Sequence, residues 1–74
     1  MTVEDLEREI IKVTQQGGLA RVSEETILEA MECEEEDRRA EMDAWLPEFC
    51  REHLLTPGQD KDMFGMTEHL FSHA

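Results

Sequence analysis

Basic residues are scarce in this sequence, with 7 Lys and Arg against 19 Asp and Glu and a net charge of −12. Such a charge repels DNA, RNA and anionic membranes, and it attracts basic protein surfaces. Aromatic side chains are also few, because the chain has no Tyr, one Trp and three Phe. Few rings are therefore left for stacking on nucleotide bases. We expect no direct binding to nucleic acid and no membrane partner.

Long apolar runs and a leader pattern are missing as well. No run approaches the ~20 apolar residues that a membrane-spanning helix needs. The first residues lack the basic and apolar regions of a signal peptide. The two cysteines, Cys33 and Cys50, are then expected to be reduced thiols. Together these absences predict a cytoplasmic protein.

Motifs that carry catalysis are absent too. There is no glycine-rich phosphate loop, and no serine has a positioned His and Asp suggested by the sequence. Carboxylates are so abundant that no pair can be assigned as general acid and base. The sequence therefore predicts a protein that is not an enzyme.

The length of 74 residues allows one domain, residues 1–74, with a small core. A core of this size supplies only a few kcal/mol, so it often needs a metal or a partner subunit. Self-association, as a homodimer, is one way to meet that need.

The hydrophobic pattern predicts an all-α fold that begins with a helix over residues 2–16. Thr2 is a suitable N-cap, and apolar residues from Val3 to Val13 recur at spacings of three and four. Gly17 and Gly18 then supply a helix stop, because glycine readily adopts the left-handed conformation.

A second helix is predicted over residues 23–55, with Ser23 as its cap. Apolar residues between Ile27 and Phe49 keep one helical phase, but polar side chains interrupt it between Met31 and Met42. Two alternatives follow: one long helix, or two helices that break near residues 34–37. Pro47 adds a kink or a new helix start.

The last predicted helix covers residues 60–72, after a turn at residues 56–59 that contains proline and glycine. Its apolar face is formed by five residues: Met63, Phe64, Met66, Leu70 and Phe71. The expected architecture is a small helical hairpin or a three-helix domain.

Eight acidic residues with no Lys or Arg among them lie between Glu24 and Asp37. On a continuous helix, four of them are spaced by four, three and four residues and form a ridge: Glu25, Glu29, Glu32 and Glu36. Such a ridge places carboxylates at spacings similar to those of nucleic-acid phosphates, and it can occupy a basic groove. The alternative is an ordinary solvated helix face. The predicted partner-binding residues are Glu25, Glu29, Glu32, Glu35, Glu36, Asp37, Trp45 and Phe49.

A second constellation has the spacing of a zinc site. Cys50 and His53 are three residues apart, and His69 and His73 are four apart, so each pair shares a helix face. Two facing helices could then close a tetrahedral site, which would also support the small core. The alternative is a buried thiol with surface histidines.

By size and acidity alone, the chain resembles phage-encoded inhibitors, DNA-mimic proteins and anti-CRISPR proteins, with no residue correspondence. This resemblance implies an inhibitor that masks or modulates a basic protein partner that handles nucleic acid. Two alternatives remain open: a helical module for dimerisation or assembly, and a zinc-stabilised adaptor.

Overall fold

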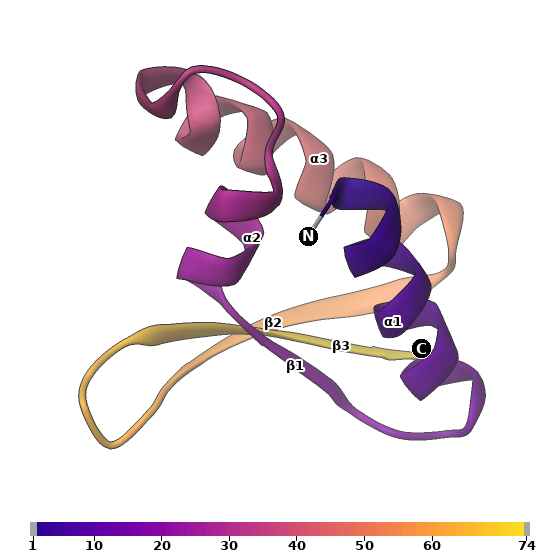
Figure 1. Cartoon of the computed structure of the whole chain (residues 1–74). Coiled ribbons are helices and arrows are strands. Elements are labelled where there is room, and N and C mark those ends of the chain that lie inside the picture. The colour runs from indigo at the N-terminus through magenta and orange to yellow at the C-terminus, as the bar shows by residue number, and fades with distance from the viewer. Residues whose placement is uncertain (1, 74) are drawn as a thin grey trace.

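Three helices and a three-stranded antiparallel sheet make up the fold in a computed structural model that describes residues 2–73 (Figure 1). The elements in chain order are α1 (Val3–Gln15), β1 (Ala20–Ser23), α2 (Glu24–Ala30), the 3-10 helix η1 (Glu35–Asp37), α3 (Arg38–Glu52), β2 (Leu55–Lys61) and β3 (Thr67–His73). The strand order is β1-β3-β2, with the helices gathered on one side of the sheet in Figure 1. The predicted all-α class is therefore wrong, and the fold is mixed α/β.

The first helix agrees with its prediction. The Thr2 side chain accepts a hydrogen bond from the Asp5 backbone N–H at 3.1 Å. Gly17 follows the helix with a φ of +79°, in the left-handed region that glycine adopts without a steric penalty. Leu6 and Ile10 are buried, so the apolar stripe faces the core.

The predicted long helix over residues 23–55 is broken. Ser23 caps α2 as expected and accepts from the Thr26 N–H at 3.2 Å, but α2 ends at Ala30. A continued helix would place the carboxylates of residues 32–37 beside one another without a cation, which is unfavourable. The loop and η1 separate them, and they let Met42 on α3 join the core. Helix α3 runs through Pro47 without a new start.

The predicted turn at residues 56–59 and the predicted helix at 60–72 are both wrong, because these residues form the β2–β3 hairpin. In β3, His69 and Phe71 are buried while their neighbours are partly exposed, which is the period-two pattern of a strand. Pro57 is tolerated because β2 is an edge strand. Gly65, with a φ of +78°, forms the turn between the strands.

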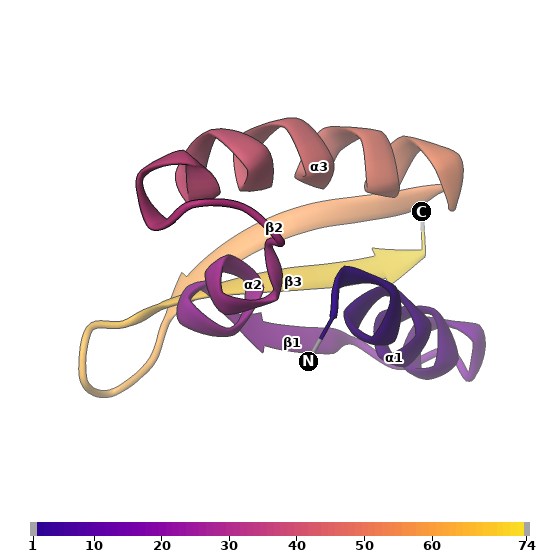
Figure 2. The same ribbon diagram turned by 45° about the horizontal axis from the view of Figure 1, so that its top comes forward.

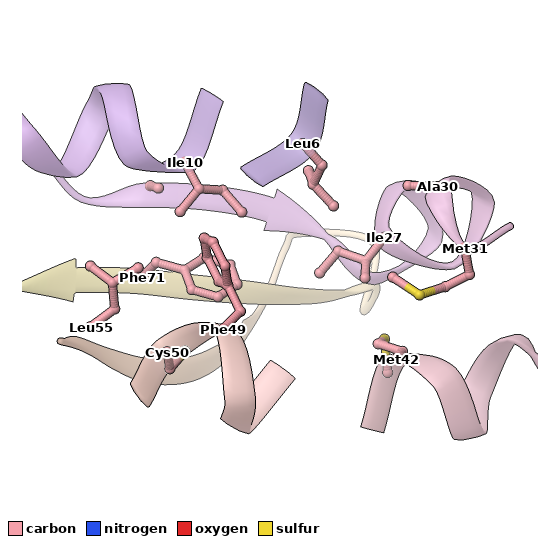
Figure 3. Close-up of a cluster of buried hydrophobic side chains, with 11 residues drawn as sticks. Leu6, Ile10, Ile27, Ala30, Met31, Met42, Phe49, Cys50, Leu55 and Phe71 are labelled. Atoms are coloured by element: carbon pink, nitrogen blue, oxygen red, sulfur yellow. The ribbon is translucent and has the colours of Figure 1, made fainter. Parts of the chain in front are cut away.

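The core lies between the helices and the sheet, and it draws on nearly every element (Figure 3). Phe49 from α3 and Phe71 from β3 meet edge to face, with ring centroids 5.9 Å apart. Trp45 stacks on Phe49 at 5.0 Å. The central strand β3 therefore provides the aromatic contact that joins the sheet to α3.

Leu54 links α3 to β2 in a strained conformation, with a φ of +55° and 74% of its surface exposed. We expect Leu54→Gly to raise the free energy of unfolding by about 1 kcal/mol, because glycine removes the left-handed penalty. Urea unfolding followed by circular dichroism measures the change. Leu54→Ala is the matched control, since it removes the same exposed side chain but keeps the strain. Equal stabilisation by both variants would contradict the strain explanation.

Candidate functional site

A groove of about 370 Å³ opens between α1, α3 and the start of the loop after α2. Its lining consists of four carboxylates over an apolar floor: Glu4, Glu7, Glu32 and Glu41, with Val3, Met31 and Trp45. Glu4 and Glu7 share the α1 face with Val3, because residues three and four apart in a helix lie side by side. The groove is therefore built from helix faces whose orientation is fixed by the core.

A second hollow of about 180 Å³ continues the groove along α3. It shares Glu7 and Trp45 with the first, and it adds Glu48, Phe49 and Glu52. Residues 41, 45, 48 and 52 are spaced by four, three and four, so they form one face of α3. We call the two hollows together the acidic groove, with six carboxylates around one indole: Glu4, Glu7, Glu32, Glu41, Glu48, Glu52 and Trp45.

Trp45 is the only tryptophan of the chain, and it is held at the centre of the acidic groove. Its indole N–H donates to Glu7 Oε2 at 3.3 Å, which joins α3 to α1. Its ring stacks on buried Phe49 with an interplanar angle of 13°. An indole beside carboxylates suits a Lys or Arg side chain, because the ring face attracts cations and the carboxylates pair with them.

No Lys or Arg contributes to the lining of the acidic groove. A neighbouring groove of similar size between α2 and α3 differs in this respect. Its lining pairs three carboxylates with two guanidinium groups: Glu25, Glu29 and Glu35 with Arg38 and Arg39, beside Leu28. Arg38 and Arg39 partly neutralise the carboxylates of this neighbouring groove. The acidic groove therefore attracts a basic ligand more strongly.

The predicted partner-binding residues are distributed over several elements. The helix that was to carry the ridge ends at Ala30, so Glu25 and Glu29 lie on α2, Glu32 lies in the loop, and Glu36 lies in η1. Of the predicted set, Glu32 and Trp45 meet in the acidic groove, whereas Glu25, Glu29 and Glu35 line the neighbouring groove. Glu36 and Asp37 are exposed in η1. Phe49 is 1% exposed and serves the core beneath Trp45.

A polar network around buried His69 joins α2, α3 and β3. Glu24 accepts from Arg39 at 3.3 Å and lies 3.4 Å from Nε2 of His69, which is 1% exposed. Burial alone would raise the pKa of Glu24, but hydrogen bonds from Arg39 and His69 and their charges bring it below its ordinary value. The His69 Nδ1 has no hydrogen-bond partner among the described residues. The network therefore depends on Glu24.

The predicted zinc ligands are not assembled. Cys50 and His53 remain near the end of α3, while His69 and His73 lie on β3, where His69 faces Glu24. Residues 2–73 contain no group of three or more His, Cys, Asp or Glu side chains that could hold a metal ion. Burial raises the pKa of the Cys50 thiol. The pKa of Cys33 is also raised, first by burial and then by nearby carboxylates such as Glu41. Both thiols are therefore poor nucleophiles near neutral pH.

Comparison with known proteins gives no relative. The chain matches no protein-family model, no curated protein and no solved structure. Among residues 2–73, no helix is long and apolar enough to cross a lipid bilayer.

The segment that contains η1 and α3 is strongly acidic, since residues 35–52 carry seven acidic and three basic side chains. This charge opposes contact of α3 with nucleic-acid phosphates.

The acidic groove was not predicted as a unit. The sequence-based prediction followed the dense acidic run between Glu24 and Asp37, whereas five of the six groove carboxylates lie on α1 and α3, outside that run. One signal was available: Glu41, Glu48 and Glu52 flank Trp45 at helical spacing. The pairing of this α3 face with α1 depends on the tertiary fold.

Proposed function

We propose that this chain is a non-enzymatic binding protein that accepts a basic segment of a protein partner in the acidic groove. The observation that supports this proposal is the position of Trp45 in both hollows of the acidic groove, whose lining has six carboxylates and no basic residue. Lys and Arg side chains offer both the charge for the carboxylates and the apolar stem for the indole. A partner that handles nucleic acid would provide such a segment, and its own site would then be masked.

Intrinsic fluorescence tests the proposal directly, because Trp45 is the only tryptophan. Titration with a Lys- and Arg-rich peptide is expected to change its emission saturably, and affinity should fall with added salt. A duplex DNA of the same length is expected to produce no change. Binding of the duplex with an affinity equal to that of the peptide would contradict a protein partner.

Two double variants separate a specific groove from the general negative field. Glu7→Gln with Glu41→Gln removes two carboxylates from the acidic groove, whereas Glu25→Gln with Glu29→Gln removes two from the neighbouring groove. Both double variants remove two negative charges from the net charge of −12. We expect the first pair to weaken peptide binding about tenfold and the second to change it little. Equal losses would mean that binding follows net charge, and a larger loss in the second pair would favour the glutamates on α2.

A further inference from the structure

The acidic groove has two halves with a common centre. Glu7 and Trp45 line both of its hollows, and every other lining residue belongs to one hollow only. The larger hollow adds three carboxylates and the smaller hollow adds two: Glu4, Glu32 and Glu41 in the first, Glu48 and Glu52 in the second. The groove therefore holds two sets of carboxylates, which we call the large set and the small set, with the indole between them.

The spacing of the two sets follows from helix α3. Glu41 lies four residues before Trp45 and Glu48 lies three residues after it, on the same helix face. A helix rises about 1.5 Å per residue, so Glu41 and Glu48 are separated by about 10 Å along the axis. Figures 1 and 2 show α3 extending to either side of the first turns of α1, which carry Glu4 and Glu7. One cationic group is therefore too small to pair with both sets at once.

The centre of the groove differs from its two sides. Glu7 is partly buried and its Oε2 accepts from the Trp45 indole N–H at 3.3 Å, whereas the other five carboxylates are exposed. The indole also stacks on buried Phe49, with ring centroids 5.0 Å apart. A fixed apolar ring between two exposed anionic sets suits a ligand whose two cations are joined by an apolar or uncharged part.

Basic residues of the chain itself do not neutralise the two sets. Four of them lie within four positions of a groove carboxylate: Arg8, Arg38, Arg39 and Arg51. Arg8 pairs with Asp5 and Arg39 pairs with Glu24, both outside the acidic groove. In the described chain, no Lys or Arg forms an ion pair with a carboxylate of the acidic groove. Both sets are thus available to the cations of a partner.

We propose that the acidic groove recognises a pair of Lys or Arg side chains on one face of the partner segment, with their charged ends about 10 Å apart and one on each side of Trp45. This inference rests on the proposed function, because it concerns the same groove, and it adds a spacing requirement. One cation pairs with the large set and holds the segment in place, so the second meets the small set as an intramolecular event. Binding therefore depends on the distance between the two cations as well as on their number.

Proline-rich peptides provide probes of known spacing. The polyproline II helix has three residues per turn and rises about 3.1 Å per residue, so Lys residues three positions apart share one face at about 9 Å. Lys residues nine positions apart also share one face, but at about 28 Å. The two peptides have the same composition and charge. We expect the three-apart peptide to bind about tenfold more tightly than the nine-apart peptide, as measured by saturation of the Trp45 fluorescence.

The same titrations separate this inference from the proposed function. If a Lys- and Arg-rich peptide binds but the three-apart and nine-apart peptides bind equally, the spacing requirement is overturned and the proposed function stands. If none of the three peptides binds, by fluorescence or by titration calorimetry, the proposed function fails and the spacing requirement fails with it.

Removal of the small set provides an independent test. Glu48→Gln with Glu52→Gln is expected to abolish the preference for the three-apart peptide, because the small set then carries no charge. Glu36→Gln with Asp43→Asn is the matched control, since both residues are exposed and neither lines the acidic groove. This control removes the same charge and is expected to lower both affinities alike, so that the preference remains. A preference that persists without the small set, or one that is lost in the control, would overturn the proposal.

Discussion

Phe71→Ala is expected to remove about 3–5 kcal/mol from the free energy of unfolding, which is most or all of the stability of a domain this small. Phe71 is 0% exposed, and it meets the rings of Phe49 and Trp45 at 5.9 and 6.3 Å. Its loss leaves a cavity where the central strand contacts α3. Circular dichroism and urea unfolding at 25 °C measure the effect.

Phe64→Ala is the matched control for this variant. It makes the same chemical change on the same hairpin, but Phe64 is 83% exposed. Its effect on the unfolding of the monomer should lie within about 0.5 kcal/mol. On the predicted helix over residues 60–72 both phenylalanines would share the apolar face. Similar losses for the two variants would therefore argue against the hairpin, and a large difference supports it.

Glu24→Ala is expected to cost about 1–3 kcal/mol more than Glu25→Ala at pH 7. Both substitutions remove a carboxylate from the first turn of α2, so their effects on the helix dipole are alike. Glu24→Ala alone also leaves buried His69 without its partner, and its Nδ1 is already unpaired among the described residues. Urea unfolding of the two variants measures the difference.

The difference should depend on pH. The pKa of Glu24 in the folded chain lies below its ordinary value of 4.5, so its stabilising effect is complete above that value. It is lost as the pH falls through the folded pKa and the carboxylate is protonated. The gap between the variants should therefore shrink in acid. A gap that stays constant down to the lowest pH at which the wild type remains folded would refute an ionised Glu24 network.

Local signals in the sequence predicted the ends of elements better than their type. Thr2, Ser23 and Gly17 act as expected, because capping and positive φ depend on neighbouring residues alone. The C-terminal strands were missed because Met63, Phe64 and Met66 suggested an apolar helix face. The alternation of His69 and Phe71 with partly exposed residues is the pattern that indicates a strand. A segment of seven residues is too short, however, to distinguish the period of a strand, 2, from that of a helix, 3.6.

The candidate site was harder to predict for a different reason. Glu7 and Trp45 are 38 residues apart in the chain, and their hydrogen bond exists only after α1 and α3 pack on the sheet. The density of charge along the sequence pointed to the segment from Glu24 to Asp37 as the site. In the structure the carboxylates of that segment do not form one surface, because they are divided between two grooves and a loop. The acidity of the chain was visible in its composition, but its distribution over the surface depends on the fold.

The position of β3 in the sheet also constrains the order of assembly. It is the last of the described elements, yet it lies between β1 and β2 and pairs with both. During synthesis β1 therefore emerges more than forty residues before its strand partner, and only the helices can form early. Such long-range pairing is slow to form, and the sheet must close in one late step after β3 has left the ribosome. Until then, the apolar faces of α1 and α2 lack the surface that finally covers them.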